Sequence, residues 1–161
     1  MKGMLVWVIG FAAILATAQE TKPPQSQEEL EARFKSTFNK ATMSGRWSPL
    51  QERKLGEEKK DQYTINSVTK VGKDLWLMNA QMHYGGKDMT IPVPVQVKWA
   101  GDTAVIIVDK FGVPGGSGNT AYSARVMVYE NTYSGTWSGG DHAGMLYGTI
   151  TQAKDSGQSK Q

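Results

Sequence analysis

The sequence predicts a mainly β protein, an antiparallel up-and-down β-barrel of about eight strands preceded by one α-helix. An amphipathic helical pattern occurs once, close to the N-terminal side of the chain. After residue 42, short runs of β-branched and aromatic residues recur between glycine-rich turns, as strands do. Most of these runs are joined by short connections, which favours sequential hairpins. A two-sheet β-sandwich is the alternative; its crossovers need long connections, and residues 112–120 could form one.

Residues 1–18 are predicted to be a cleaved secretory signal peptide. Lys2 supplies a positive charge, an apolar stretch follows, and Ala16-Thr17-Ala18 has the small-x-small pattern of a cleavage site. A membrane-spanning helix needs about 20 apolar residues, and the polar residues 19–22 end this stretch too early. We therefore expect an exported protein, located in the periplasm, in the cell envelope or outside the cell, with no stable membrane insertion after cleavage.

Composition narrows the classes of function. The chain has no cysteine, so disulfides and thiolate metal ligands are excluded. The formal net charge is +3, and basic residues are mixed with acidic ones, as in Glu52-Arg53-Lys54. Such mixing is typical of a solvated surface rather than of a stripe that binds nucleic acid. No nucleic-acid partner, cofactor or metal is predicted.

The exported part is long enough for one domain with a core. Residues 19–25 contain Pro23-Pro24 and are expected to form an extended linker. Residues 26–152 then form the helix and the barrel, and the polar residues 153–161 a disordered tail.

The helix is predicted over residues 27–40. Ser26 at the N-cap and Glu29 three residues later match a capping box. The apolar stripe at helical spacing is expected to cover one mouth of the barrel. It consists of Leu30, Phe34, Phe38 and Ala41.

The strand pattern is clearest in residues 75–84 and 90–99, where large apolar residues alternate with polar residues or prolines. Pro92 and Pro94 remove hydrogen-bond donors from one side of the second run, so we expect this strand to lie at an edge or a seam there. The expected strands are 43–49, 62–71, 75–84, 90–99, 103–108, 122–130, 133–138 and 145–151.

Two short motifs carry a family resemblance. Gly45-Arg46-Trp47, at the start of the first strand and after a helix, resembles the G-x-W opening of lipocalins and other calycins. The resemblance implies a lipocalin-like, calycin-type barrel in which Trp47 packs across the closed end, with Trp137 of Gly135-Thr136-Trp137 as a second closure residue. Lipocalins also place a late arginine over the tryptophan; Arg46 and Arg125 are the candidate substitutes here.

The whole mature chain also looks similar to small exported bacterial proteins of uncharacterised function. Those proteins end in a Gly-Thr-Trp-Ser strand followed by a Gly-x-Leu-x-Gly-x-Ile strand, which here is Gly144 to Ile150. This resemblance implies no particular ligand.

A small hydrophobic ligand inside the barrel is the first functional hypothesis. Aromatic and methionine side chains make adaptable apolar walls, although a packed core needs the same residues and is the more frequent explanation. The candidate ligand-binding residues are Tyr63, Trp76, Met78, Met82, Tyr84 and Trp99.

Two alternatives remain open. A small barrel enzyme could use His83 or His142 with Asp88 or Asp141, but zinc takes three or four ligands at recognisable spacings, and Asp141-His142 is also typical of a turn. A cell-envelope protein could instead bind a protein or a polysaccharide by its surface. The sequence favours a binding or interaction module over an enzyme and predicts no oligomeric state.

Overall fold

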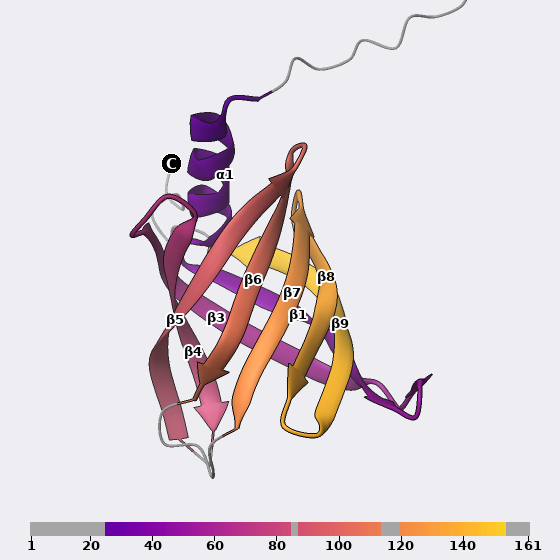
Figure 1. The fold of residues 1–161 in the computed structure, drawn as a ribbon. Coiled ribbons are helices and arrows are strands. Elements are labelled where there is room, and N and C mark those ends of the chain that lie inside the picture. Colours follow the sequence, from indigo (N-terminus) through magenta and orange to yellow (C-terminus); the bar gives the residue numbers. More distant parts are fainter. Residues whose placement is uncertain (1–24, 85–86, 114–119, 154–161) are drawn as a thin grey trace, which may run out of the picture.

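The computed structural model describes residues 25–84, 87–113 and 120–153 (Figure 1). The signal peptide at 1–18, the linker up to residue 24 and tail residues 154–161 lie outside this part of the chain. The described helix is α1 (Gln27–Phe38). The described strands are β1 (Ala41–Gln51), β2 (Lys54–Leu55), β3 (Lys59–Lys70), β4 (Leu75–Tyr84), β5 (Lys87–Ala100), β6 (Thr103–Gly112), β7 (Ala121–Tyr129), β8 (Thr132–Gly139) and β9 (His142–Gln152).

The strands close into a barrel. The order in the sheet is β2-β1-β3-β4-β5-β6-β7-β8-β9, and β1 also pairs with β9. Every neighbouring pair is antiparallel, so eight strands form the closed barrel and β2 lies outside it. This confirms the predicted up-and-down barrel with one N-terminal helix, rather than the sandwich. Figure 1 shows α1 standing at one end of the barrel.

The helix begins as predicted and ends two residues earlier. The Glu29 backbone N–H donates to the Ser26 hydroxyl over 3.2 Å, and the Ser26 N–H donates to the Glu29 carboxylate over 2.8 Å. Asn39 is already extended and Lys40 has a φ of 54°. This left-handed residue turns the chain into β1, whose first residue, Ala41, is fully buried.

The apolar stripe of α1 packs onto the barrel core. Phe34 is 3% exposed and Phe38 is 0% exposed. The Phe34 ring meets Trp76 edge-on at 5.2 Å between centroids and Trp99 at 6.3 Å. Edge-to-face pairs of this kind add stability beyond the burial of area. The apolar core therefore begins under the helix and continues through the inward-facing side chains of the strands.

The hairpin of β1 and β2 is the element that sequence patterns did not predict. Leu50 pairs with Leu55 and Gln51 with Lys54. The turn between them uses Glu52 at φ 48° and Arg53 at φ 64°. Such turns normally carry asparagine, aspartate or glycine, so this one has no recognisable signature.

The two prolines lie at a seam of the barrel, as expected. Over the described residues β5 pairs with β6 only from Gln96 to Ala100, whereas it pairs with β4 from Lys87 to Gln96. The Val97 backbone N–H donates to the Asp74 carbonyl oxygen beside β4. Backbone groups alternate in direction along a strand, so the backbone nitrogens of even-numbered residues such as Pro92 and Pro94 point away from β4. The prolines thus remove donors from the edge that β6 leaves unpaired, which disfavours strand addition there.

Candidate functional site

One cross-strand row inside the barrel contains two adjacent glycines. Gly45 of β1 pairs with Gly148 of β9, Asp61 of β3 pairs with Gly45, and Tyr133 of β8 pairs with Gly148. The row therefore runs Asp61, Gly45, Gly148, Tyr133 across four neighbouring strands. Because its two central members have no side chain, the inner wall is bare backbone at this level.

Neither glycine has room for a side chain. A Cβ on Gly45 would overlap the carbonyl oxygen of Tyr147 and lie 2.6 Å from the Tyr133 hydroxyl oxygen. A Cβ on Gly148 would overlap the Ser44 carbonyl oxygen and lie 2.7 Å from the Tyr133 hydroxyl oxygen. The hydroxyl of Tyr133 thus lies directly over the two glycines, and close backbone approach is what requires them.

The Tyr133 hydroxyl is a buried polar group without a hydrogen bond. Tyr133 is 3% exposed, and its hydroxyl oxygen finds no partner among the described residues. Burial raises the pKa of Tyr133 to about 12, and the negative charge of Asp61 acts in the same direction. A buried polar group without a hydrogen bond lowers the free energy of unfolding by about 1–3 kcal/mol. Such a group in a native fold calls for an explanation, and here it lies at the glycine pair.

Asp61 and Tyr63 complete a polar trio with Tyr133. Asp61 is half-buried; its carboxylate accepts the Gln62 backbone N–H over 3.0 Å and a hydrogen bond from the Tyr63 hydroxyl. Burial raises the pKa of Asp61, and these two hydrogen bonds oppose the rise. The pKa of Tyr63 is also raised, first by burial and then by its bond to Asp61.

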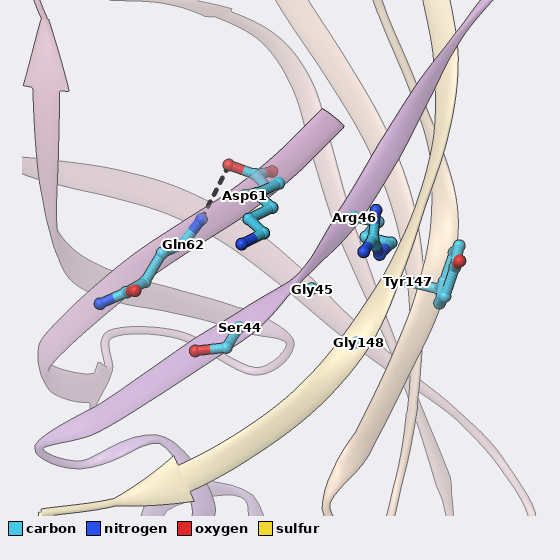
Figure 2. A pocket seen from close by; sticks show the side chains of 8 residues that line it. Ser44, Gly45, Arg46, Asp61, Gln62, Tyr147 and Gly148 are labelled. Carbon is cyan, nitrogen blue, oxygen red and sulfur yellow. Dashed lines mark hydrogen bonds between the residues drawn. The ribbon is translucent and has the colours of Figure 1, made fainter. Parts of the chain in front are cut away.

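A hollow of about 480 Å³ lies on three of these four strands, β1, β3 and β9. Figure 2 shows residues of β1, β3 and β9 arranged around it, with the two glycines between them. Its long polar side chains, Arg46, Lys60 and Gln62, are exposed, as is Tyr147. We call this site the β1–β3–β9 hollow. It is lined by Ser44, Gly45, Arg46, Lys60, Asp61, Gln62, Tyr147 and Gly148.

Glu58 holds two side chains of the hollow. Its carboxylate lies 3.7 Å from the Arg46 guanidinium and accepts a 2.7 Å hydrogen bond from the Tyr147 hydroxyl. This bond raises the pKa of Tyr147. Arg46 and Glu58 are both about half exposed, so their ion pair is weak. An incoming anion could therefore replace Glu58 at the guanidinium.

The two tryptophans of the resembling motifs meet each other. Trp47 and Trp137 form an edge-on pair with ring centroids 5.6 Å apart. The cation over Trp47 is Lys59, whose Nζ lies 5.1 Å from the ring centroid and which pairs with Trp47 across β1 and β3.

The two candidate substitutes, Arg46 and Arg125, have other partners, and Lys59 is the cation over Trp47. Arg46 faces Glu58, and Arg125 lies 3.7 Å from Asp109 and donates to the Val108 carbonyl oxygen. Alternation along β1 turns residue 46 away from residue 47, whereas Lys59 occupies the matching position on the neighbouring strand.

The candidate ligand-binding residues separate into two groups. Trp76 and Met78 are buried in the core, and Trp76 and Trp99 contact Phe34 of the helix. Tyr63 belongs to the polar trio. The side chains of Met82 and Tyr84 lie outside the described part of the structure. A ligand-binding role for this set stays a prediction.

The candidate catalytic residues lie on two different hairpins. Asp141 and His142 are exposed neighbours 3.2 Å apart in the β8–β9 turn. Asp88 is exposed on β5 opposite residue 83 of β4, and the side chain of His83 is outside the description. In the sheet, β6 and β7 separate the two hairpins. Among the side chains that the structure describes, no group of three histidines or carboxylates could hold a metal ion.

Comparisons with protein-family models, curated proteins and solved structures found no match to this chain. No helix within the described ranges is long and apolar enough to cross a membrane. The closed barrel with one helix is consistent with the lipocalin-like architecture implied by the two G-x-W motifs. The resemblance to lipocalins therefore concerns the barrel architecture and identifies no ligand.

Proposed function

We propose that this protein is an exported binding module that takes a small anionic, hydrogen-bonding ligand in the β1–β3–β9 hollow. The observation that carries the proposal is the pair of exposed cations, Arg46 and Lys60, which line the hollow next to the backbone of Gly45 and Gly148. The hollow's volume of about 480 Å³ lies within the range of small-molecule sites. Export is supported by the signal-peptide pattern in residues 1–18.

Arg46 is the principal anchor in this proposal. A guanidinium offers parallel donors that match a carboxylate or a phosphate in a bidentate way. Its separation from Glu58 is 3.7 Å, longer than a good charge-assisted hydrogen bond. A ligand anion can therefore form better bonds than the present partner does, while Lys60 adds a second positive charge.

The remaining groups suit the polar part of such a ligand. Ser44 and Gln62 offer a hydroxyl and an amide, which can both donate and accept. Gly45 and Gly148 contribute only backbone atoms to the lining. Asp61 accepts hydrogen bonds when ionised and donates one when protonated. Its raised pKa favours the protonated form, which does not repel an anion.

The barrel interior under α1 is the less favoured place for a ligand. Trp76 is 2% exposed, and its ring already contacts Phe34. A hydrophobic ligand among Trp76, Met78 and Trp99 would have to displace these contacts. The hollow on β1, β3 and β9 needs no such displacement.

The test is a calorimetric titration of the protein with inorganic phosphate and with galacturonate at low salt. We expect saturable binding of at least one probe, and about tenfold weaker binding after Arg46→Gln, as for the loss of one charge-assisted contact. Arg53→Gln, in the β1–β2 turn outside the hollow, is the matched control and is expected to leave binding unchanged. The absence of saturable binding of both probes, or an equal loss in the two variants, would contradict the proposal.

A further inference from the structure

We propose that the outer face of β6, β7, β8 and β9 is the surface through which two copies of this chain form a dimer. These four strands are consecutive neighbours in the barrel and lie side by side in Figure 1. Their outward-facing residues follow from the alternation of buried and exposed positions. They are Thr103, Val105, Ile107 and Asp109 on β6; Ala121, Ser123, Arg125, Met127 and Tyr129 on β7; Thr132, Ser134, Thr136 and Ser138 on β8; and Ala143, Met145, Tyr147, Thr149 and Thr151 on β9.

This face carries almost no net charge. The whole chain has 18 lysines and arginines and 15 aspartates and glutamates, yet only Arg125 and Asp109 are charged among these outward positions. The two form an ion pair at 3.7 Å, and the Arg125 guanidinium also donates to the Val108 carbonyl oxygen over 2.8 Å. Protein interfaces are depleted in lysine, glutamate and aspartate and enriched in tyrosine, methionine and arginine. The composition of this face matches that pattern.

On this face, the small side chains of β8 lie between larger side chains of β7 and β9. Every outward residue of β8 is a serine or threonine. On one side, Met127 and Tyr129 of β7 are 54% and 49% exposed, and on the other side Met145 and Tyr147 of β9 are 45% and 47% exposed. We call the outward face of β8 the hydroxyl track. Large exposed apolar side chains rarely gather in this way without a binding role.

A second copy is the occupant that fits the relief. A two-fold axis parallel to the strands and midway between β7 and β8 places β7 of each copy over the hydroxyl track of the other. Val105, Met127, Ser134 and Tyr147 form one cross-strand row. Under this axis Met127 meets Ser134 of the partner subunit, and Val105 meets the partner's Tyr147. The large side chains of β7 thus face the small side chains of β8 in the partner, and both copies use the same residues.

Charge also favours a second copy over an acidic partner. Without Lys2 of the expected signal peptide, the formal net charge is 3 − 1 = +2, so two copies repel each other through a face that carries lysines. An acidic partner would be attracted to those lysines and not to a face without net charge. Two copies of this chain can meet through the face of β6, β7, β8 and β9 without this repulsion.

The size of the face predicts a weak dimer. Four strands about 4.8 Å apart and about eight residues long span an area about 19 Å wide and about 25 Å long. The area of this face is below the ~800 Å² per partner of a standard interface. Because the barrel wall is convex, the area that two copies can bury is smaller still. We expect a reversible dimer with a dissociation constant on the order of 10 µM.

Sedimentation equilibrium of the protein purified from its own host, over a concentration series, tests the proposal. We expect the mass to rise toward that of two chains, and Ser134→Glu to shift the dissociation constant by at least tenfold, because it buries a charge against Met127 of the partner. Thr69→Glu, at an exposed outward position of β3, is the matched control and should leave the dimer intact. Equal melting temperatures of the two variants show that folding is unaffected.

Three results would overturn the proposal. The first is a single-chain mass at all concentrations up to several hundred micromolar. The second is a dimer that Ser134→Glu leaves unchanged, and the third is equal dissociation by Thr69→Glu. A single-chain protein that instead binds a host polysaccharide, with binding lost in Ser134→Glu, would assign the face to a glycan. Tyr147 lines both this face and the β1–β3–β9 hollow, but Ser134→Glu leaves Arg46 and Lys60 in place. Anion binding at Arg46 can therefore be measured in the same variant, and the two proposals fail separately.

Discussion

The barrel has two contrasting inner regions. Under α1 the interior is filled with large apolar side chains, among them Phe34, Phe38 and Trp76. At the row of Asp61, Gly45, Gly148 and Tyr133 the wall is backbone, and the nearest groups are polar. The first region buries apolar area, which drives folding. The second keeps a half-buried carboxyl and an unpaired hydroxyl, which oppose it.

This difference suggests that the region under α1 stabilises the fold and that the region around the glycine pair serves binding. Local rules of packing and polar satisfaction are normally obeyed throughout a domain, and departures from them gather at functional sites. Tyr133 and Asp61 are such departures, and they lie next to the hollow that holds Arg46 and Lys60. The region under α1 shows no comparable departure among its described side chains. Three substitutions test this contrast.

Phe38→Ala is expected to have the largest effect. Phe38 is fully buried and lies 4.8 Å from the Phe34 ring, and its truncation leaves a cavity as well as losing burial. The free energy of unfolding should fall by about 4 kcal/mol, measured by urea denaturation. Phe111→Ala, at a half-buried position on β6, is the control with a smaller loss. A loss below about 1 kcal/mol at Phe38 would mean that the helix contributes little to the core.

Gly45→Ala should have the next largest effect. The new methyl group would meet backbone atoms of β9 and the Tyr133 hydroxyl, and neither can move without disturbing the β1–β9 pairing. We expect the free energy of unfolding to fall by about 3 kcal/mol. Gly112→Ala, where a Cβ would meet nothing within 4 Å, is the matched control. If the two variants were equally stable, the close approach at the glycine pair would be refuted.

Asp61→Asn is expected to have the smallest effect and to depend on pH. The pKa of Asp61 is raised above its ordinary value of 3.8 by burial, so its protonated form is the one that the folded state prefers. Its contribution to stability is fully present below that ordinary value and is lost as pH rises through the raised pKa.

The asparagine variant cannot ionise and keeps an oxygen that can accept from Gln62 and Tyr63. Its melting temperature should therefore exceed that of the native chain at pH 7 and match it near pH 3. Calorimetric melting curves across this range provide the measurement. A variant that is less stable at pH 7 would show that ionised Asp61 supports the fold, and the contrast between the two regions would have to be abandoned.

Elements with local signatures were predicted well. The capping box at Ser26 and Glu29 fixed the start of α1 because both partners lie within one helical turn. Alternation in residues 75–84 and 90–99 predicted β4 and β5 because side chains of a strand alternate between faces. Pro92 and Pro94 predicted the seam because proline lacks the donor that a ladder needs. The β2 strand was missed because its turn carries no glycine, asparagine or aspartate.

The candidate site was not predictable in the same way. Gly45 and Gly148 are far apart in sequence, and so are Asp61 and Tyr133; they meet because closure of the barrel sets the register of β1 against β9 and β3. A shift of one residue would turn each of them to the opposite face. Lys59 came to lie over Trp47 for the same reason.

Sequence patterns were therefore sufficient for the helix, the order of the eight barrel strands and the alternating faces of β4 and β5, because these depend on neighbouring residues. Tertiary structure alone decided which side chains share a row: the glycine pair under Tyr133, the cations beside the hollow, and the hydroxyl track between two apolar ridges. Those juxtapositions depend on hydrogen-bond register between distant strands, which the packing of the closed barrel selects as a whole.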